Sequence, residues 1–101
     1  MDAAFTALEE ISLFARQRGV EVLLENTPNG FSSAEGLLRF LEITHLNLNV
    51  CFDTGHAHLM GSVSAAYEVL KERIRSTHVH DNKKDRDTHL WPGEGSIPWK
   101  E

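Results

Sequence analysis

Three residues that can bind a metal ion, Glu25, Asp53 and His78, each stand at the end of a short stretch that is predicted to be a β-strand. They follow one another at intervals of about 25 to 30 residues, close to the length of one strand–helix–strand repeat. In a barrel of parallel strands such ends converge, so the three side chains are expected to meet. Two carboxylates and an imidazole suit Mn²⁺, Zn²⁺ or Mg²⁺. One such residue alone would be interpreted as a solvated strand end, but three in succession favour a metal site.

Two short motifs bring more donor groups to the same region. Asp53-Thr54-Gly55-His56 has a second imidazole three residues after the carboxylate, and Asp87-Thr88-His89 has a carboxylate and an imidazole two residues apart. Both spacings suit shared contact with a metal ion or a substrate. His58 and His80 are interpreted as structural residues or as supports for the ligands, because Asp81 and Asn82 indicate that the preceding strand does not continue.

The residues between these positions are predicted to form helices that alternate with the strands. Apolar residues recur every three or four positions in the first segment, and Gly19 is placed to end that helix. Ser32 and Glu35 fit a capping box for the second helix. The expected elements are a helix at 3–18, a strand at 20–24, a helix ending near 44, a strand at 48–52, a helix at 64–74, a strand at 75–80 and a long loop at 81–101.

This alternation predicts an α/β fold with a parallel sheet and right-handed crossovers. About three β/α units are present, whereas a complete (β/α)8 TIM barrel has eight units in ~250 residues. A three-stranded sheet also leaves two open edges and a half-covered apolar face. Residues 1–101 are therefore expected to be a fragment of a single barrel domain.

The composition is that of an ordinary globular chain, with 101 residues of which 41% are hydrophobic and 25% charged. No apolar run approaches the roughly 18 residues of a membrane span, and no signal peptide is recognised, so a cytoplasmic location is expected. The net charge of −5 argues against a nucleic-acid partner without excluding one. Cys51 lies in an apolar stretch and is predicted to be a buried, inert thiol.

Four segments together resemble the signatures of the xylose isomerase-like superfamily, which includes sugar phosphate isomerases and epimerases and also endonuclease IV (AP endonuclease family 2). They are Leu24-Glu25-Asn26-Thr27, Cys51-Phe52-Asp53-Thr54-Gly55-His56, His78-Val79-His80-Asp81-Asn82 and Pro92-Gly93-Glu94-Gly95-Ser96-Ile97-Pro98-Trp99. The resemblance extends from about Val20 to Trp99. It implies that the chain supplies strands five, six and seven of the barrel with their helices.

For the epimerase branch the resemblance implies a metal-dependent isomerase or epimerase acting on a small sugar or sugar phosphate. One divalent ion, Mn²⁺ in the first place and Zn²⁺, Mg²⁺ or Co²⁺ as alternatives, would be held by Glu25, Asp53 and His78 and by a glutamate from strand eight that this sequence lacks. Glu25 and that glutamate would transfer a proton at the carbon next to the carbonyl, through an enediolate.

The same resemblance implies that His56 is catalytic and binds a substrate oxygen. Lys84 and Glu94 are further candidate substrate contacts, although the arginine that the epimerases use has no certain counterpart among Lys83, Lys84 and Arg86. The exact sugar and the oligomeric state cannot be derived from the sequence, and a homo-oligomer is left open.

The alternative is an endonuclease IV-like phosphodiesterase that acts on abasic DNA. In that branch three zinc ions activate water, and their ligands match Glu25, Asp53, His56, His78, Asp87 and His89, all of which this chain retains. His56, Asp87 and His89 are thus candidates for additional metal or substrate contact. The acidic balance of the chain decides for the isomerase, with the nuclease as the second hypothesis.

Overall fold

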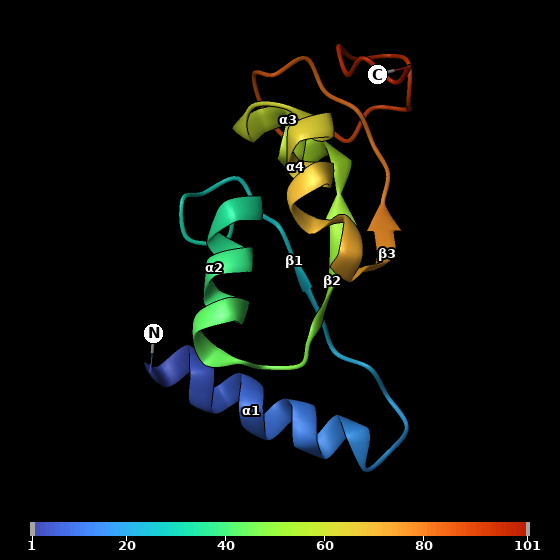
Figure 1. Cartoon of the computed structure of the whole chain (residues 1–101). Helices are drawn as coiled ribbons and strands as arrows, with labels where there is room; N and C mark the ends of the chain where they lie inside the picture. Colours follow the sequence, from blue (N-terminus) through green and yellow to red (C-terminus); the bar gives the residue numbers. More distant parts are fainter. Residues whose placement is uncertain (1, 101) are drawn as a thin grey trace.

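Three parallel β-strands form the centre of the structure, a computed structural model that describes residues 2–100. They are β1 (Leu23–Glu25), β2 (Asn49–Asp53) and β3 (Ile74–His78), hydrogen-bonded in the order β1-β2-β3. The helices are α1 (Asp2–Arg16), α2 (Ala34–Thr44), α3 (Thr54–Met60) and α4 (Val63–Leu70), and a short 3₁₀ helix, η1 (Lys71–Arg73), leads into β3 (Figure 1). This confirms the predicted α/β class with three β/α units.

The ends of the first two helices show how local side chains set the boundaries. α1 ends at Arg16, and Gly19 follows it in a left-handed conformation (φ 70°), as expected for a residue that terminates a helix. α2 is capped by Ser33, whose hydroxyl accepts a hydrogen bond from the Gly36 N–H at 3.2 Å. The prediction of Ser32 as the cap is wrong, because the Ser32 hydroxyl donates to Asn29 Oδ1 in the preceding loop.

The helix α3 was not expected, since a loop was predicted directly after Asp53. It forms because the Asp53 carboxylate accepts a hydrogen bond from the His56 N–H at 2.8 Å and so caps the first turn. The following helix is shorter than predicted, at Val63–Leu70, and Ile74 begins β3 rather than ending a helix. The second β/α unit therefore has two short helices in place of one long one.

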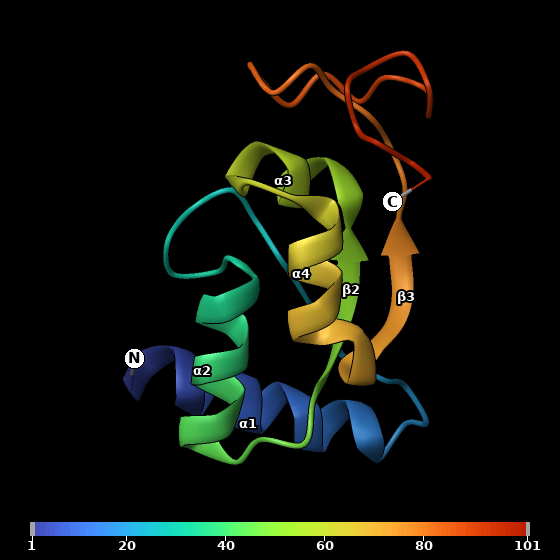
Figure 2. The same cartoon turned by 45° about the horizontal axis from the view of Figure 1, so that its top comes forward.

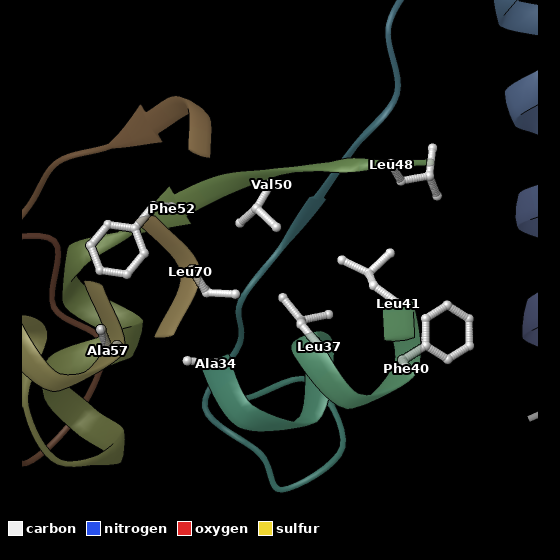
Figure 3. Close-up of a cluster of buried hydrophobic side chains, with 10 residues drawn as sticks. Ala34, Leu37, Phe40, Leu41, Leu48, Val50, Phe52, Ala57 and Leu70 are labelled. Atoms are coloured by element: carbon white, nitrogen blue, oxygen red, sulfur yellow. The ribbon is translucent and has the colours of Figure 1, made fainter. Parts of the chain in front are cut away.

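The apolar core lies between the sheet and the helices α2 and α4, which cover the same face of the sheet (Figure 2). Val50 of β2 points toward Leu37 and Leu70 of these helices, and Phe52 lies beside Ala57 and Leu70 (Figure 3). Full burial of an aliphatic side chain of this size contributes about 1.5–3 kcal/mol to the free energy of unfolding. Cys51 lies between the two core positions of β2 and is buried and free of a disulfide, as predicted.

The carboxyl ends of the strands lie at the same edge of the sheet, beside the segment that follows β3 (Figures 1 and 2). Between residues 81 and 100 this segment contains no helix or extended strand. Its one β-type backbone pairing is an isolated antiparallel bridge between Asp81 and Leu90. The predicted long loop is confirmed over these residues. Within residues 2–100, no helix has both the length and the apolar character needed to cross a bilayer.

A single buried carboxylate, that of Asp81, organises this loop. It accepts hydrogen bonds at 2.8–3.2 Å from the N–H groups of Asn82, Gly93, Gly95 and Ile97 and from the Trp99 indole. Burial alone would raise the pKa of Asp81, but the indole and the backbone donors lower the pKa to about 2. The loop is thus ordered without regular secondary structure.

Candidate metal centre

Strand register brings the three predicted metal ligands to one face of the sheet. Glu25 on β1 is paired with Cys51 on β2, and Asp53 on β2 is paired with His78 on β3. Paired residues, and residues two apart on one strand, project to the same side of a sheet. Glu25, Asp53 and His78 therefore share the face opposite the core positions Val50 and Phe52.

The donor atoms of these side chains lie at distances suited to a single ion. His78 Nδ1 is 3.3 Å from Glu25 Oε2 and 3.8 Å from Asp53 Oδ2, and all three donor atoms lie within 4.8 Å of one another. Metal–ligand bonds of about 2.0–2.3 Å place neighbouring donors roughly 3–4 Å apart. Two hard carboxylate oxygens and one imidazole nitrogen in this arrangement fit a divalent cation.

His56 lies beside this set and connects it to the long loop. Its Nδ1 is 2.8 Å from the Asn26 carbonyl oxygen and 3.3 Å from Glu25 Oε2, while its Nε2 is 3.0 Å from Asp87 Oδ2. Burial would lower the pKa of His56, but the Asn26 carbonyl and the carboxylates of Asp53 and Asp87 raise it above its usual value.

The long loop brings Asp87 and His89 back to the strand ends. His89 Nε2 is 3.3 Å from Asp87 Oδ2, and His80 Nδ1 is 3.8 Å from Asp87 Oδ1. The rings of His80 and His89 stack in parallel with their centroids 4.0 Å apart. His80, Asp87 and His89 thus form a second set of three donors within reach of one ion.

Hydrogen bonding keeps Asp53 ionised between the two sets. Burial alone would raise the pKa of this carboxyl group, but the hydrogen bond from the His56 N–H, followed by the close approach of the His80 ring, holds the pKa below its usual value. The side chain is only 2% exposed, whereas Glu25 is 31% exposed. Asp53 therefore remains a negatively charged carboxylate deep in the site, whereas the Glu25 carboxylate is more exposed.

A cavity of about 610 Å³ opens over these groups. Its walls are formed by Glu25, Asp53, His56, His78, Val79, His80, His89, Leu90, Trp91 and Pro92. The volume lies within the roughly 300–1,000 Å³ that is usual for small-molecule sites. The lining combines carboxylates and imidazoles with the apolar side chains of Val79, Leu90, Trp91 and Pro92.

The family model for the xylose isomerase-like TIM barrel matches residues 1–101. The chain belongs to this family. A structure of a D-tagatose 3-epimerase-like protein superimposes on 97% of the chain with a TM-score of 0.83 and 34% sequence identity. A xylose isomerase domain protein from Planctomyces limnophilus, at 21% identity, shares the fold over 98% of the chain with a TM-score of 0.79.

Two curated relatives also match this xylose isomerase-like chain. The uncharacterized protein MJ1311 of Methanocaldococcus jannaschii is 36% identical over 96% of the chain, and the uncharacterized protein y4fM of Sinorhizobium fredii is 28% identical over 94% of it. The chain spans 36% and 32% of the lengths of these two relatives. It spans 40% and 39% of the two solved structures.

Two residues of the xylose isomerase-like site were not among its predicted ligands. His80 is buried, its Nε2 lies 2.7 Å from Asp53 Oδ1, and neither ring nitrogen has a hydrogen bond of good geometry within residues 2–100. Its ring packs so closely against Gly55 that a side chain there would clash. The alternation of His78 with His80 was the available signal, but it could not show that His80 faces Asp53 after the strand has ended.

Asn26 is the second residue that sequence reasoning missed. Its side chain is buried and makes two hydrogen bonds to the backbone of Asp53, donating to the carbonyl at 3.0 Å and accepting from the N–H at 2.8 Å. These bonds tie the residue after Glu25 to the end of β2. The separation of the carboxylates of Glu25 and Asp53, the two predicted metal ligands, is therefore set partly by Asn26.

The predicted substrate contacts Lys84 and Glu94 lie elsewhere in the loop. Glu94 Oε1 accepts a hydrogen bond from the Trp91 N–H, and the backbone N–H of Lys84 donates to Asn82 Oδ1. Neither side chain is among the described residues that line the cavity. His58, predicted to be structural, is buried and bonds to Ser96 Oγ at 2.8 Å, and its burial lowers its pKa.

Proposed function

We propose that the protein is a divalent-metal-dependent isomerase or epimerase of a small sugar or sugar phosphate. The observation that carries this proposal is the convergence of Glu25, Asp53 and His78 on one point in the wall of the cavity. Membership of the xylose isomerase-like family and the likeness to a D-tagatose 3-epimerase-like protein support it.

In this proposal Glu25, Asp53 and His78 hold the ion, Mn²⁺ in the first place and Zn²⁺, Mg²⁺ or Co²⁺ as alternatives. When bound, such an ion polarises carbonyl and hydroxyl oxygens and stabilises the negative charge that develops on them. Glu25 removes the proton from the carbon next to the carbonyl, since it is the more exposed carboxylate and has a second oxygen for the proton. His56, raised in pKa, donates a hydrogen bond from Nε2 to a substrate oxygen, which takes the place of Asp87 Oδ2.

We also propose that residues 1–101 are part of one longer barrel domain. β1 and β3 each have an edge without a partner strand within the described residues, and exposed edges of this kind promote aggregation. Residues 1–101 expressed alone should therefore show no cooperative thermal unfolding as a monomer. A sharp monomeric transition together with turnover would contradict this.

A second function, cleavage of abasic DNA as in endonuclease IV, has one specific observation in its favour. Asp87 lies 3.0 Å from His56 Nε2 and 3.8 Å from His80 Nδ1, and His89 Nε2 lies 3.3 Å from Asp87, so that the site has donor atoms for more than one ion. The net charge of −5 opposes the binding of a polyanion by this part of the protein.

The test is proton exchange at the substrate carbon, followed by NMR in D₂O on the complete natural protein loaded with Mn²⁺. The panel contains D-tagatose, D-fructose, D-xylulose and their phosphates. At least one sugar should exchange its α-proton, and Glu25→Gln should abolish the exchange because the amide cannot accept the proton. Glu21→Gln is the matched control, since Glu21 is a half-exposed carboxylate paired with Arg75 outside the cavity.

The two functions give opposite results in this assay. Nicking of a duplex with a single abasic site, without exchange of any sugar proton, would replace the isomerase by the nuclease. Metal content measured by mass spectrometry on the protein as purified, before it is loaded with Mn²⁺, distinguishes one bound ion from three.

A further inference from the structure

The indole of Trp91 is the largest apolar group in the wall of the candidate site. It is 79% exposed, although it lines the same cavity as Glu25, Asp53 and His78. Trp99, the other tryptophan, is 39% exposed and donates its indole N–H to the buried carboxylate of Asp81 at 3.0 Å. Trp99 is thus used by the fold, whereas most of the Trp91 ring surface has no contact with the other described residues.

The backbone that carries Trp91 is held rigidly. The Glu94 N–H donates to the Trp91 carbonyl at 3.0 Å, with Pro92 and Gly93 (φ 97°) between them, as a type II turn requires. The Glu94 carboxylate closes the same turn by accepting from the Trp91 N–H at 3.2 Å. In addition, the Gly93 N–H donates to Asp81 at 3.0 Å.

An exposed aromatic ring on such a turn is suited to binding rather than to folding. Because the turn is fixed in the free protein, little conformational entropy is lost when a ligand contacts the ring. Sugars combine hydroxyl groups with a face of C–H groups, and small-molecule sites pair a few polar groups with aromatic walls. The carboxylates and imidazoles supply the polar side of this cavity, and Trp91 supplies an aromatic side.

We propose that Trp91 is a substrate-binding residue that packs its indole against the C–H face of the sugar, and that Glu94 is a positioning residue for Trp91. This inference rests on the proposed function, because it assumes that a sugar occupies the cavity. Contact with the ring is present in both the ground state and the transition state, so it contributes to binding and not to the chemical step.

The test uses the complete Mn²⁺-loaded protein, with proton exchange of D-tagatose, D-fructose and D-xylulose measured against sugar concentration. Trp91→Ala should raise KM about tenfold and leave kcat within about twofold, as expected for the loss of uniform binding. Trp91→Phe should recover most of the loss. Glu94→Gln keeps the acceptor for the turn and should be near wild type, whereas Glu94→Ala should raise KM. Phe31→Ala removes an exposed aromatic ring outside the cavity and is the control.

Fluorescence gives a readout that does not depend on turnover. Every sugar that undergoes proton exchange should change the indole emission of the wild type, and the change should be absent in Trp91→Phe, which retains Trp99. Emission changes without proton exchange would uphold the role of Trp91 while removing the isomerase. Proton exchange with an unchanged KM in Trp91→Ala would overturn the role of Trp91 and leave the isomerase intact. If the sugars cause neither exchange nor an emission change, both proposals fail.

Discussion

The donor atoms of the candidate metal centre have two kinds of support. One group, the strand set, consists of Glu25, Asp53 and His78 on adjacent parallel strands, where the register of the sheet determines their spacing. The other, the loop set, consists of Asp87 and His89 on a loop that has one isolated bridge within residues 81–100. The strands are paired along their length by backbone hydrogen bonds. The segment that carries Asp87 and His89 is closed by the backbone bridge between Asp81 and Leu90, and the five hydrogen bonds accepted by the Asp81 carboxylate hold the residues on either side of that segment.

Because of this difference, single substitutions should affect the position of the strand residues less than that of the loop residues. A change in one strand residue cannot shift the register, because neighbouring backbone bonds remain. A change in Asp81 removes a common partner of several loop segments at once. The loop wall, with His89 and Trp91, is therefore the part of the site in which single substitutions have wide structural effects.

The largest expected effect comes from removing Asp53, the central candidate ligand of the strand set. Asp53→Ala should weaken Mn²⁺ binding more than roughly 100-fold, because a ligand matters more than the outer contacts that cost 10–100-fold. It also removes the cap of α3. Isothermal titration of the complete protein measures the affinity, and Asp85→Ala, an exposed carboxylate of the loop, is the control. Unchanged affinity in Asp53→Ala would exclude the strand set as the metal site.

The next effect tests the support of the loop set. Asp81→Asn leaves several buried N–H groups without a charged acceptor and should lower the free energy of unfolding by roughly 2–4 kcal/mol. Hydrogen exchange measured by mass spectrometry should increase at the amides of Gly93, Gly95 and Ile97 and remain unchanged in β2. Equal increases in both regions would show that the loop and the sheet open together, and the proposed difference between them would be wrong.

A smaller effect is expected from acid. The pKa of Asp81 is lowered to about 2 from its usual value of 3.8, so its carboxylate contributes stability above about pH 4. That contribution should be lost as the pH falls from about 4 to 2, where the folded-state carboxylate takes up its proton. The difference in urea unfolding free energy between wild type and Asp81→Asn should shrink over this range. A constant difference would contradict the assignment.

The smallest effect is expected far from both donor sets. Ser33→Ala removes the cap of α2 and should lower the free energy of unfolding by about 1 kcal/mol, with no change in metal affinity. Ser32→Ala distinguishes the observed cap from the one predicted from sequence, and it should cost less. Urea unfolding of the two variants of the complete protein provides the measurement, and a larger loss in Ser32→Ala would favour the predicted cap.

Local sequence patterns were sufficient where the signal lies within a few residues. The alternation of helices and strands, the end of α1 before Gly19 and the buried Cys51 all follow from short-range patterns of apolar and turn residues. The long loop after β3 was predicted for the same reason. Local patterns failed at α3, because Asp53 was interpreted only as a ligand and not also as the cap of a helix.

The positions of Glu25, Asp53 and His78 at strand ends could be derived from the sequence, because a polar residue after an apolar stretch marks where a buried strand stops. That they share one face was decided by the register between strands, which no local pattern specifies. The roles of Asn26 and His80 depend on contacts with Asp53 about 27 residues away in the chain. Such long-range contacts form only when the units pack together, so the tertiary structure alone determines how the site is held and which side chains line it.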